Sequence, residues 1–145
     1  MIKFPAEAFD TVFRNALKRG AIILTEKEFE DISKPKFFIT LNKDPSLDDI
    51  YFFTTTSKTD FYNKHPRFES DIIRIQAGEI SCFNIETIII CREVHSFAKN
   101  ELMKRFREGK LKFKDNLPNN ILIKLDEIIR RSKLLSKNIK RIICP

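Results

Sequence analysis

The sequence predicts one α+β domain, in which an N-terminal helix precedes a small β-barrel or strongly curved sheet and C-terminal helices follow it. Three observations predict this fold class. Apolar residues recur at helical spacing near both ends of the chain, short β-branched and aromatic runs fill the middle, and no linker or internal repeat divides the 145 residues. We therefore expect a helix over 5–19, barrel strands over about 20–95 and a helical part over 96–143.

The first helix is expected from its apolar face. Residues at helical spacing form that face: Phe9, Val12, Phe13, Ala16 and Leu17. Pro5 suits a first helical turn, and Gly20 suits the residue just beyond the last turn. This helix is expected to pack on the rest of the domain.

Five strands are expected next, each rich in β-branched or aromatic residues. They are Ala21–Thr25, Phe37–Leu41, Ile50–Thr56, Asp71–Gln76 and Thr87–Cys91. Short strands with polar turns between them indicate a small barrel or curved sheet. The longer segments 26–35 and 57–70 are expected to be loops, where function often lies.

The period of the apolar residues changes after Val94, which indicates helices. We expect one helix over 97–107 and a clearer one over 118–131, where Ile121, Leu125 and Ile128 belong to an apolar stripe. The segment 139–143 is compatible with a short helix or an added strand.

Charge is unevenly distributed along the chain. The formal net charge is +7, but residues 98–145 carry fourteen Lys and Arg against five Asp and Glu, a net +9, whereas the first 97 residues carry −2. Such asymmetry favours a polyanionic partner, either nucleic acid or an acidic protein. The alternative is a set of solvated helix faces in a lysine-rich sequence.

Composition excludes several classes of protein. With three Gly, the chain cannot build the glycine-rich loops that bind nucleotides, so we expect no cofactor. The three cysteines form no Cys-x-x-Cys pair and only two His are present, so no metal site is expected. No apolar run approaches the ~20 residues of a membrane span, so a cytoplasmic protein without a membrane partner is expected.

Polar residues at two strand boundaries are the best candidates for a site. Thr56, Ser57 and Lys58 end one strand, and hydroxyls beside an ammonium group can hold a phosphate, although the same residues also suit an ordinary turn. Lys34 and Lys36 precede another strand, where two ammonium groups could steady charge on a phosphorane-like transition state or could simply form the polar edge of a loop.

The two histidines are further candidates. His65 lies in a polar segment with Arg67 nearby, and His95 follows a buried-looking strand. Two imidazoles could supply the base and the acid of ribonucleotide cleavage, or both could be ordinary structural residues.

Four stretches, in this order and spacing, give the chain a family resemblance. They are Arg19–Leu24, Lys34–Lys36 with the strand to Asn42, Phe53–Lys58, and Ile75–Glu79 with Glu86–Val94. Together they resemble the MazF/PemK family of toxin endoribonucleases over roughly residues 19–131. The resemblance implies an SH3-like barrel, usually a homodimer, that cleaves single-stranded RNA without a metal and is held by an acidic antitoxin.

The resemblance also implies roles for individual residues. Thr56 matches the threonine that serves cleavage, with Ser57 beside it, and Lys36 or Lys34 stands where the family has a catalytic arginine. Lys58 ends a matching stretch and is expected to bind the substrate, as are His65 and Arg67, which are candidates from their polar segment and not from the resemblance. Because lysine lacks the bidentate fork of arginine, two alternatives stay open: an inactive relative that docks on a protein as CcdB-like toxins do, or an RNA-binding module.

Overall fold

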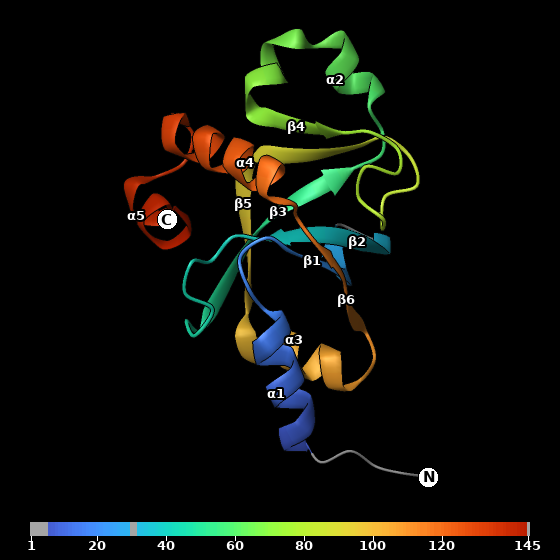
Figure 1. Ribbon diagram of the computed structural model, residues 1–145, viewed down its shortest axis with the longest axis vertical. Coiled ribbons are helices and arrows are strands. Elements are labelled where there is room, and N and C mark those ends of the chain that lie inside the picture. The colour runs from blue at the N-terminus through green and yellow to red at the C-terminus, as the bar shows by residue number, and fades with distance from the viewer. Residues whose placement is uncertain (1–5, 30–31, 145) are drawn as a thin grey trace.

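The computed structural model describes residues 6–29 and 32–144, and it has a curled six-stranded antiparallel sheet with helices at both ends of the molecule (Figure 1). The strands are β1 (Ala21–Phe29), β2 (Ile32–Thr40), β3 (Asp49–Thr56), β4 (Ile72–Ile75), β5 (Thr87–Ala98) and β6 (Leu111–Asn116), in the order β4-β5-β3-β2-β1-β6. The helices are α1 (Ala6–Ala16), α2 (Asp60–Lys64), α3 (Lys99–Arg107), α4 (Asn119–Arg131) and α5 (Lys137–Ile143), with a 3-10 turn η1 (Pro66–Asp71). The α+β class is confirmed.

Irregular pairing bends the sheet. Along the pair of β3 and β5, Thr54 lies opposite Ile90 but Phe52 lies opposite His95, so extra residues of β5 bulge out between these pairs. A second irregularity interrupts β1 against β6 between Ile22 and Ile23. Bulges increase local twist and bend the strand that carries them, which gives this sheet its half-barrel curl.

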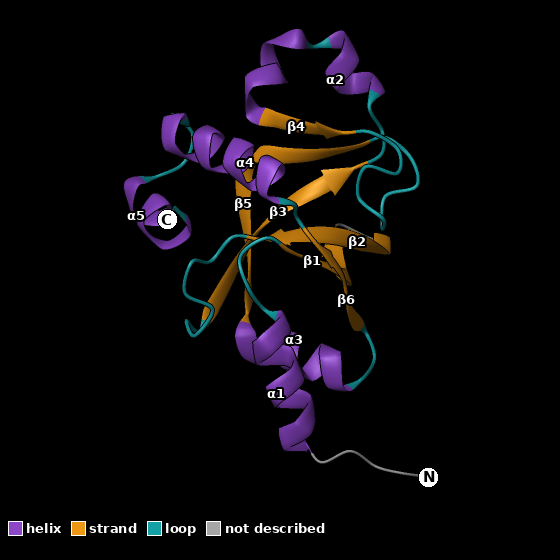
Figure 2. Ribbon diagram, in the orientation of Figure 1, coloured by secondary structure: helices purple, strands orange, loops and turns teal. Residues whose placement is uncertain are grey.

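Figure 2 shows α4 and α5 beside one part of the sheet and α1 and α3 beside another, and the sheet has two hydrophobic cores. The first core joins strand residues such as Phe53 and Ile89 to α4 and α5 through Leu125 and Ile143. The second core joins the other part of the sheet to α1 and α3. Its centre is a triad of edge-to-face rings, with centroids 5.5–5.9 Å apart, formed by Phe38, Phe52 and Phe97. Phenylalanine dominates the aromatic composition because these rings pack against one another.

Arg19 fastens the C-terminal helices to the start of β1. Its Nη2 atom lies 2.5 Å from Asp126 Oδ1 on α4, and its Nε donates a hydrogen bond to the carbonyl of Ile143 on α5, at 3.0 Å. Gly20, next to it, adopts φ +87°, a conformation that favours glycine. The turn into β1 is therefore fixed by backbone conformation and by charge.

Several sequence predictions are corrected by the structure. Residues 26–29 and 32–35, expected in a loop, extend β1 and β2, and the expected loop 57–70 contains α2 and η1. The C-terminal third also contributes the edge strand β6, and 139–143 lies in α5. Val12, placed on the inner face, is 56% exposed because α1 packs through Phe13 and Leu17. None of the described helices combines the length and apolar character needed to cross a membrane.

Candidate functional site

The register of β2 and β3 brings Lys36 and Thr56 to neighbouring positions. Phe38 pairs with Thr54, and Thr55 Oγ1 donates a hydrogen bond to the carbonyl of Phe37 at 3.2 Å. Continuing the antiparallel register by two residues places Lys36, just before Phe37, opposite Thr56, just after Thr55. Residues opposite each other lie on the same face of the sheet. An exposed lysine and a half-buried threonine thus lie side by side where the two strands meet the surface.

The chain turns immediately after Thr56. The backbone N–H of Lys58 donates to Thr56 Oγ1 at 3.1 Å, a local bond that favours turns, and Ser57 and Lys58 are exposed. The Thr56 hydroxyl keeps its own hydrogen for a further acceptor. Lys34 pairs with Lys27 across the β1–β2 hairpin, but its side chain lies outside the described part of the structure.

The other predicted site residues, His65 and Arg67, lie on the segment formed by α2 and η1. The ring of His65 lies among those of Phe61, Tyr62 and Phe68, and we call these four rings the aromatic cluster. Phe61 stacks on His65 with centroids 4.3 Å apart and on Phe68 at 5.7 Å, with interplanar angles of 25° and 19°. The guanidinium carbons of Arg67 and Arg92 lie 4.6 and 4.0 Å from the centre of the Phe68 ring. Cations over an aromatic face are attracted by the ring quadrupole.

His65 has a defined hydrogen-bond partner. Its Nδ1 lies 2.7 Å from the carbonyl oxygen of Phe61, which can only accept a hydrogen bond. The neutral imidazole therefore carries its proton on Nδ1 and leaves the lone pair of Nε2 available to a ligand. Nearby, burial raises the pKa of the Tyr62 hydroxyl, and the positive charge of Arg92 offsets part of that rise.

Arg74 ties this segment to the sheet. Its guanidinium donates to both carboxylate oxygens of Glu69, at 2.8 and 3.0 Å, and to Asn63 Oδ1 at 2.9 Å, with Glu86 at 3.3 Å. The bond from Arg74 lowers the pKa of Glu69, and Glu69 in turn raises the pKa of Arg74. A single residue of β4 thus holds α2 and η1 in place.

The sheet order links Arg74 to the strand-end residues. Arg74 lies opposite Ile88, and Ile88 lies opposite Thr56 on its other side, so the three share one face and Arg74 is roughly 10 Å from Thr56 across the sheet. Thr25 continues the row, because it is the β1 partner of Lys36. Lys36, Thr56 and Arg74 therefore lie on one face of the sheet, with the buried side chain of Ile88 between Thr56 and Arg74.

His95 does not belong to that surface. It pairs with Phe52 at the opposite half of β5, roughly 20 Å along the strand from Ile88, the partner of Thr56. The expected pair of imidazoles is therefore not brought together at the strand ends.

Sequence reasoning missed Arg74, Arg92, Phe61 and Phe68. One signal for the rings was available, since residues 61, 65 and 68 follow the i, i+4, i+7 spacing of a helix face. The two arginines gave no local signal, because their roles depend on which strands become neighbours.

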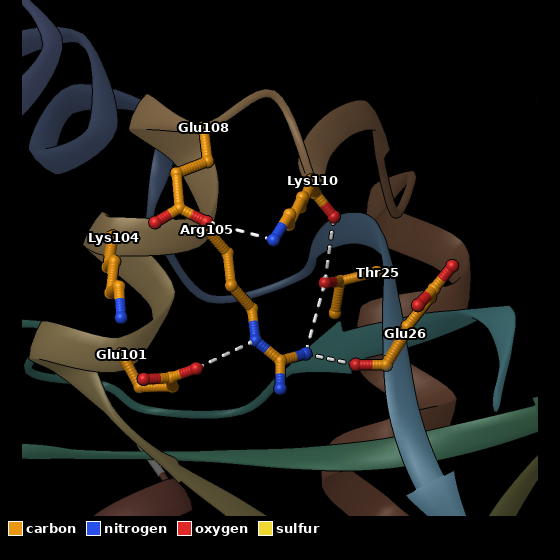
Figure 3. Close-up of a pocket in the computed structure, with 7 residues that line it drawn as sticks. All are labelled: Thr25, Glu26, Glu101, Lys104, Arg105, Glu108 and Lys110. Atoms are coloured by element: carbon orange, nitrogen blue, oxygen red, sulfur yellow. Dashed lines mark hydrogen bonds and ion pairs between the residues drawn. The ribbon is translucent and has the colours of Figure 1, made fainter.

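A pocket of about 210 Å³ lies between α3 and the edge of the sheet (Figure 3). Arg105 occupies its centre and donates to Glu101 Oε1 at 3.2 Å, to Thr25 Oγ1 at 3.3 Å and to the carbonyl of Glu26. Lys110 pairs with Glu108 on the same wall, at 3.1 Å. Because these charges neutralise one another, the arrangement joins α3 to β1 and has no excess charge to select a ligand.

No protein-family model matches this chain, and comparison with curated proteins finds no match. The likeness to the MazF/PemK family therefore rests on the four stretches of sequence alone and stays a prediction. The functional argument depends on the geometry described above.

Proposed function

We propose that this protein is a metal-independent endoribonuclease of toxin–antitoxin type, which cuts single-stranded RNA where the end of β3 lies beside the middle of β2. The observation that carries the proposal is the register that makes Lys36 and Thr56 neighbours on one face. Adjacent strands lie about 4.8 Å apart, so one phosphodiester can contact both side chains. In this proposal the curled sheet is a divergent SH3-like barrel.

The chemistry would be an internal transfer at phosphorus. The 2′-oxygen of the ribose attacks the adjacent phosphorus, the bond from phosphorus to the 5′-oxygen breaks, and a 2′,3′-cyclic phosphate and a 5′-hydroxyl remain. The 2′-hydroxyl proton passes to a base, and the leaving 5′-oxygen takes a proton from an acid or from water. The Nε2 atom of His65 is the proposed base, because Nδ1 is occupied by the Phe61 carbonyl.

The strand-end residues would stabilise charge. Thr56 would donate its hydroxyl hydrogen to a non-bridging phosphate oxygen, with Ser57 exposed beside it, and the ammonium of Lys36 would face the negative charge that grows in the transition state. Lys58 and Arg67, also exposed, would hold neighbouring phosphates. Lysine in the place of arginine offers one point charge where arginine offers a fork, so slow cleavage is expected.

The proposed partners follow from charge. Five exposed cations on or beside α4 and α5 suit an acidic antitoxin segment: Arg130, Arg131, Lys133, Lys137 and Arg141. The proposal also includes a cytoplasmic location and a homodimer, and light scattering of the pure protein would test the latter.

Cleavage is tested with long single-stranded RNA in EDTA. The wild type should produce fragments with 2′,3′-cyclic phosphate ends, and Thr56→Ala or Lys36→Ala should lower the rate about 10²- to 10³-fold. Lys124→Ala and Thr11→Ala, exposed on α4 and α1, are matched controls that should cut like the wild type. RNA left intact by the wild type, or cut at equal rates by all variants, would overturn the proposal.

A second candidate is an RNA-binding module that does not cut. The separation of His95 from the strand ends favours it, since no second imidazole is available as an acid there. Salt-sensitive binding of intact RNA, without shortening in EDTA, would support this candidate. A CcdB-like docking role would instead give a single co-purifying protein and no RNA binding.

A further inference from the structure

We propose that the aromatic cluster on α2 and η1 is a platform on which bases of single-stranded RNA stack. The inference rests on the proposed function for the identity of the ligand and adds where the bases bind. Phe61, His65 and Phe68 lie within 6.2 Å of one another, centre to centre, and Phe61 is nearly parallel to both of the others. Base–aromatic stacking is the usual source of affinity in sequence-tolerant binding of single strands.

The rings are kept at the surface. No residue of α2 or η1, all of which the structure describes, is fully buried, and Phe61 is 49% exposed. The segment therefore belongs to neither of the two cores, and forms one end of the molecule, away from α1 and α3 (Figure 1). Its aromatic residues contribute little to core burial, which leaves Phe61 available to a ligand.

The platform is built before any ligand arrives. Arg74 fixes both ends of the segment through Asn63 on α2 and Glu69 on η1. Arg92 pairs with Asp71 at 3.6 Å and lies over Phe68, so this ring is held by a cation as well. Pre-organised rings bind with a smaller entropy cost than rings on a mobile loop.

The charge around the rings suits a polyanion. The carboxylates of Glu69 and Asp71 are engaged by Arg74 and Arg92. Three exposed cations also lie on or just before this segment, Lys58, Lys64 and Arg67, against one further exposed carboxylate, Asp60. Rings that face solvent beside cations meet both needs of a single strand, since bases stack and phosphates require positive charge.

The platform directly follows the strand-end site in the chain. Phe61 is five residues after Thr56, so their Cα atoms are at most about 18 Å apart. One short oligonucleotide would therefore reach both. We expect the phosphate beside Thr56 to belong to a nucleotide near the one that stacks on Phe61.

The test uses the absence of tryptophan from the chain. Phe61→Trp places the only tryptophan of the chain on the platform, and Val12→Trp places it on α1 at a similarly exposed position, 56% against 49%; the emission of tryptophan is recorded apart from that of the two tyrosines. A 2′-O-methyl oligoribonucleotide binds without being cut. We expect it to quench Phe61→Trp saturably and to leave Val12→Trp unchanged, whereas an abasic strand of the same length should quench neither.

Affinity provides the second measurement. Fluorescence anisotropy should show that Phe61→Ala weakens binding of the 2′-O-methyl strand about 5- to 100-fold and leaves binding of the abasic strand unchanged. Equal loss for both strands, binding without quenching of Phe61→Trp, or no binding by the wild type would overturn the inference. Because the ligand cannot be cut, the two proposals fail separately: a wild type that leaves RNA intact, together with saturable quenching of Phe61→Trp, would overturn the nuclease and leave the platform standing.

Discussion

The contact between Arg19 and Asp126 is the sharpest point at which to test the fold. The two side chains are 15% and 20% exposed, and they join the start of β1 to α4. The same guanidinium holds the Ile143 carbonyl of α5. Asp126→Ala would remove the carboxylate and leave most of the arginine charge shielded from water with one neutral acceptor.

The expected cost follows from that burial. Removing one partner of a fully buried ion pair costs about 3–5 kcal/mol. Partial exposure and the remaining Ile143 carbonyl reduce this, so we expect about 2–3 kcal/mol for Asp126→Ala. For a domain of this length, 1 kcal/mol moves the melting temperature by about 3 °C, which predicts a decrease of about 6–9 °C.

Thermal unfolding followed by circular dichroism measures this decrease. Glu127→Ala is the matched control, because Glu127 is exposed on the same helix, and it should change the free energy of unfolding by less than about 0.5 kcal/mol. The double variant Arg19→Met with Asp126→Leu should lose at least ~1 kcal/mol less than the sum of the single losses. If Asp126→Ala and Glu127→Ala have the same melting temperature, the ion pair between Arg19 and Asp126 does not fasten α4 to the sheet and the reasoning fails.

Three further predictions concern single positions. Gly20→Ala should cost at least about 1–2 kcal/mol in urea titrations, since its backbone is left-handed and a Cβ would lie 3.0 Å from Leu122 Cδ2; unchanged stability would contradict the turn described for β1. The hydrogen bond from Arg74 holds the pKa of Glu69 below the ordinary glutamate value of 4.5, so the bond stabilises the protein above that pH and is lost as the pH falls through the folded pKa. Acid should therefore increase amide exchange in α2 and η1 more in the wild type than in Glu69→Gln, and equal pH profiles would exclude this bond. Burial raises the pKa of the Cys91 thiol, so iodoacetamide at about pH 8 should leave Cys91 unmodified until guanidinium unfolds the chain. Labelling of Cys91 in the folded protein would instead show that this thiol lies at the surface.

Elements whose side chains enter a core could be predicted from the sequence. The run Thr87–Cys91 reads as a strand because four of its five residues are buried, and α4 reads as a helix because its apolar stripe faces the first core. In both, the period of the sequence matches the period at which the element meets the core. Local pattern therefore determined these assignments.

The missed elements lack that match. Leu111 is the one buried residue of β6, and the next buried residue, Leu117, lies just beyond its end. Lysines alternate with apolar residues only over the first half of the strand, so the period of two is too short to identify it. No residue of α2 is buried, so this helix has no apolar stripe to reveal it. Its position depends on Arg74, which is distant in sequence from Asn63 and close only in the fold.

The candidate site also has parts that the local sequence predicts and parts that only strand pairing decides. That Thr56 ends a strand was predictable, whereas Lys36, expected just before a strand, lies inside β2 because the strand begins at Ile32. The register that makes the two neighbours depends on the pairing of β2 with β3. The place of Arg74 depends further on the order β4-β5-β3, in which the fourth and fifth strands add to the outer side of the third. Sequence alone identifies the polar ends of strands, whereas sheet order decides which ends form one surface.

Arg74 connects the two parts of the proposed RNA surface. It shares a face with Thr56 across two strands, and through Asn63 and Glu69 it sets the position of the rings on α2 and η1. Its bond to Glu69 raises the pKa of a group that is already protonated and charged at every physiological pH, so the arginine does not lose its charge by deprotonation. The spacing between a phosphate at Thr56 and a base at Phe61 is then fixed by a permanent charge, which would let the surface select extended single strands over a stacked duplex whose bases face inward.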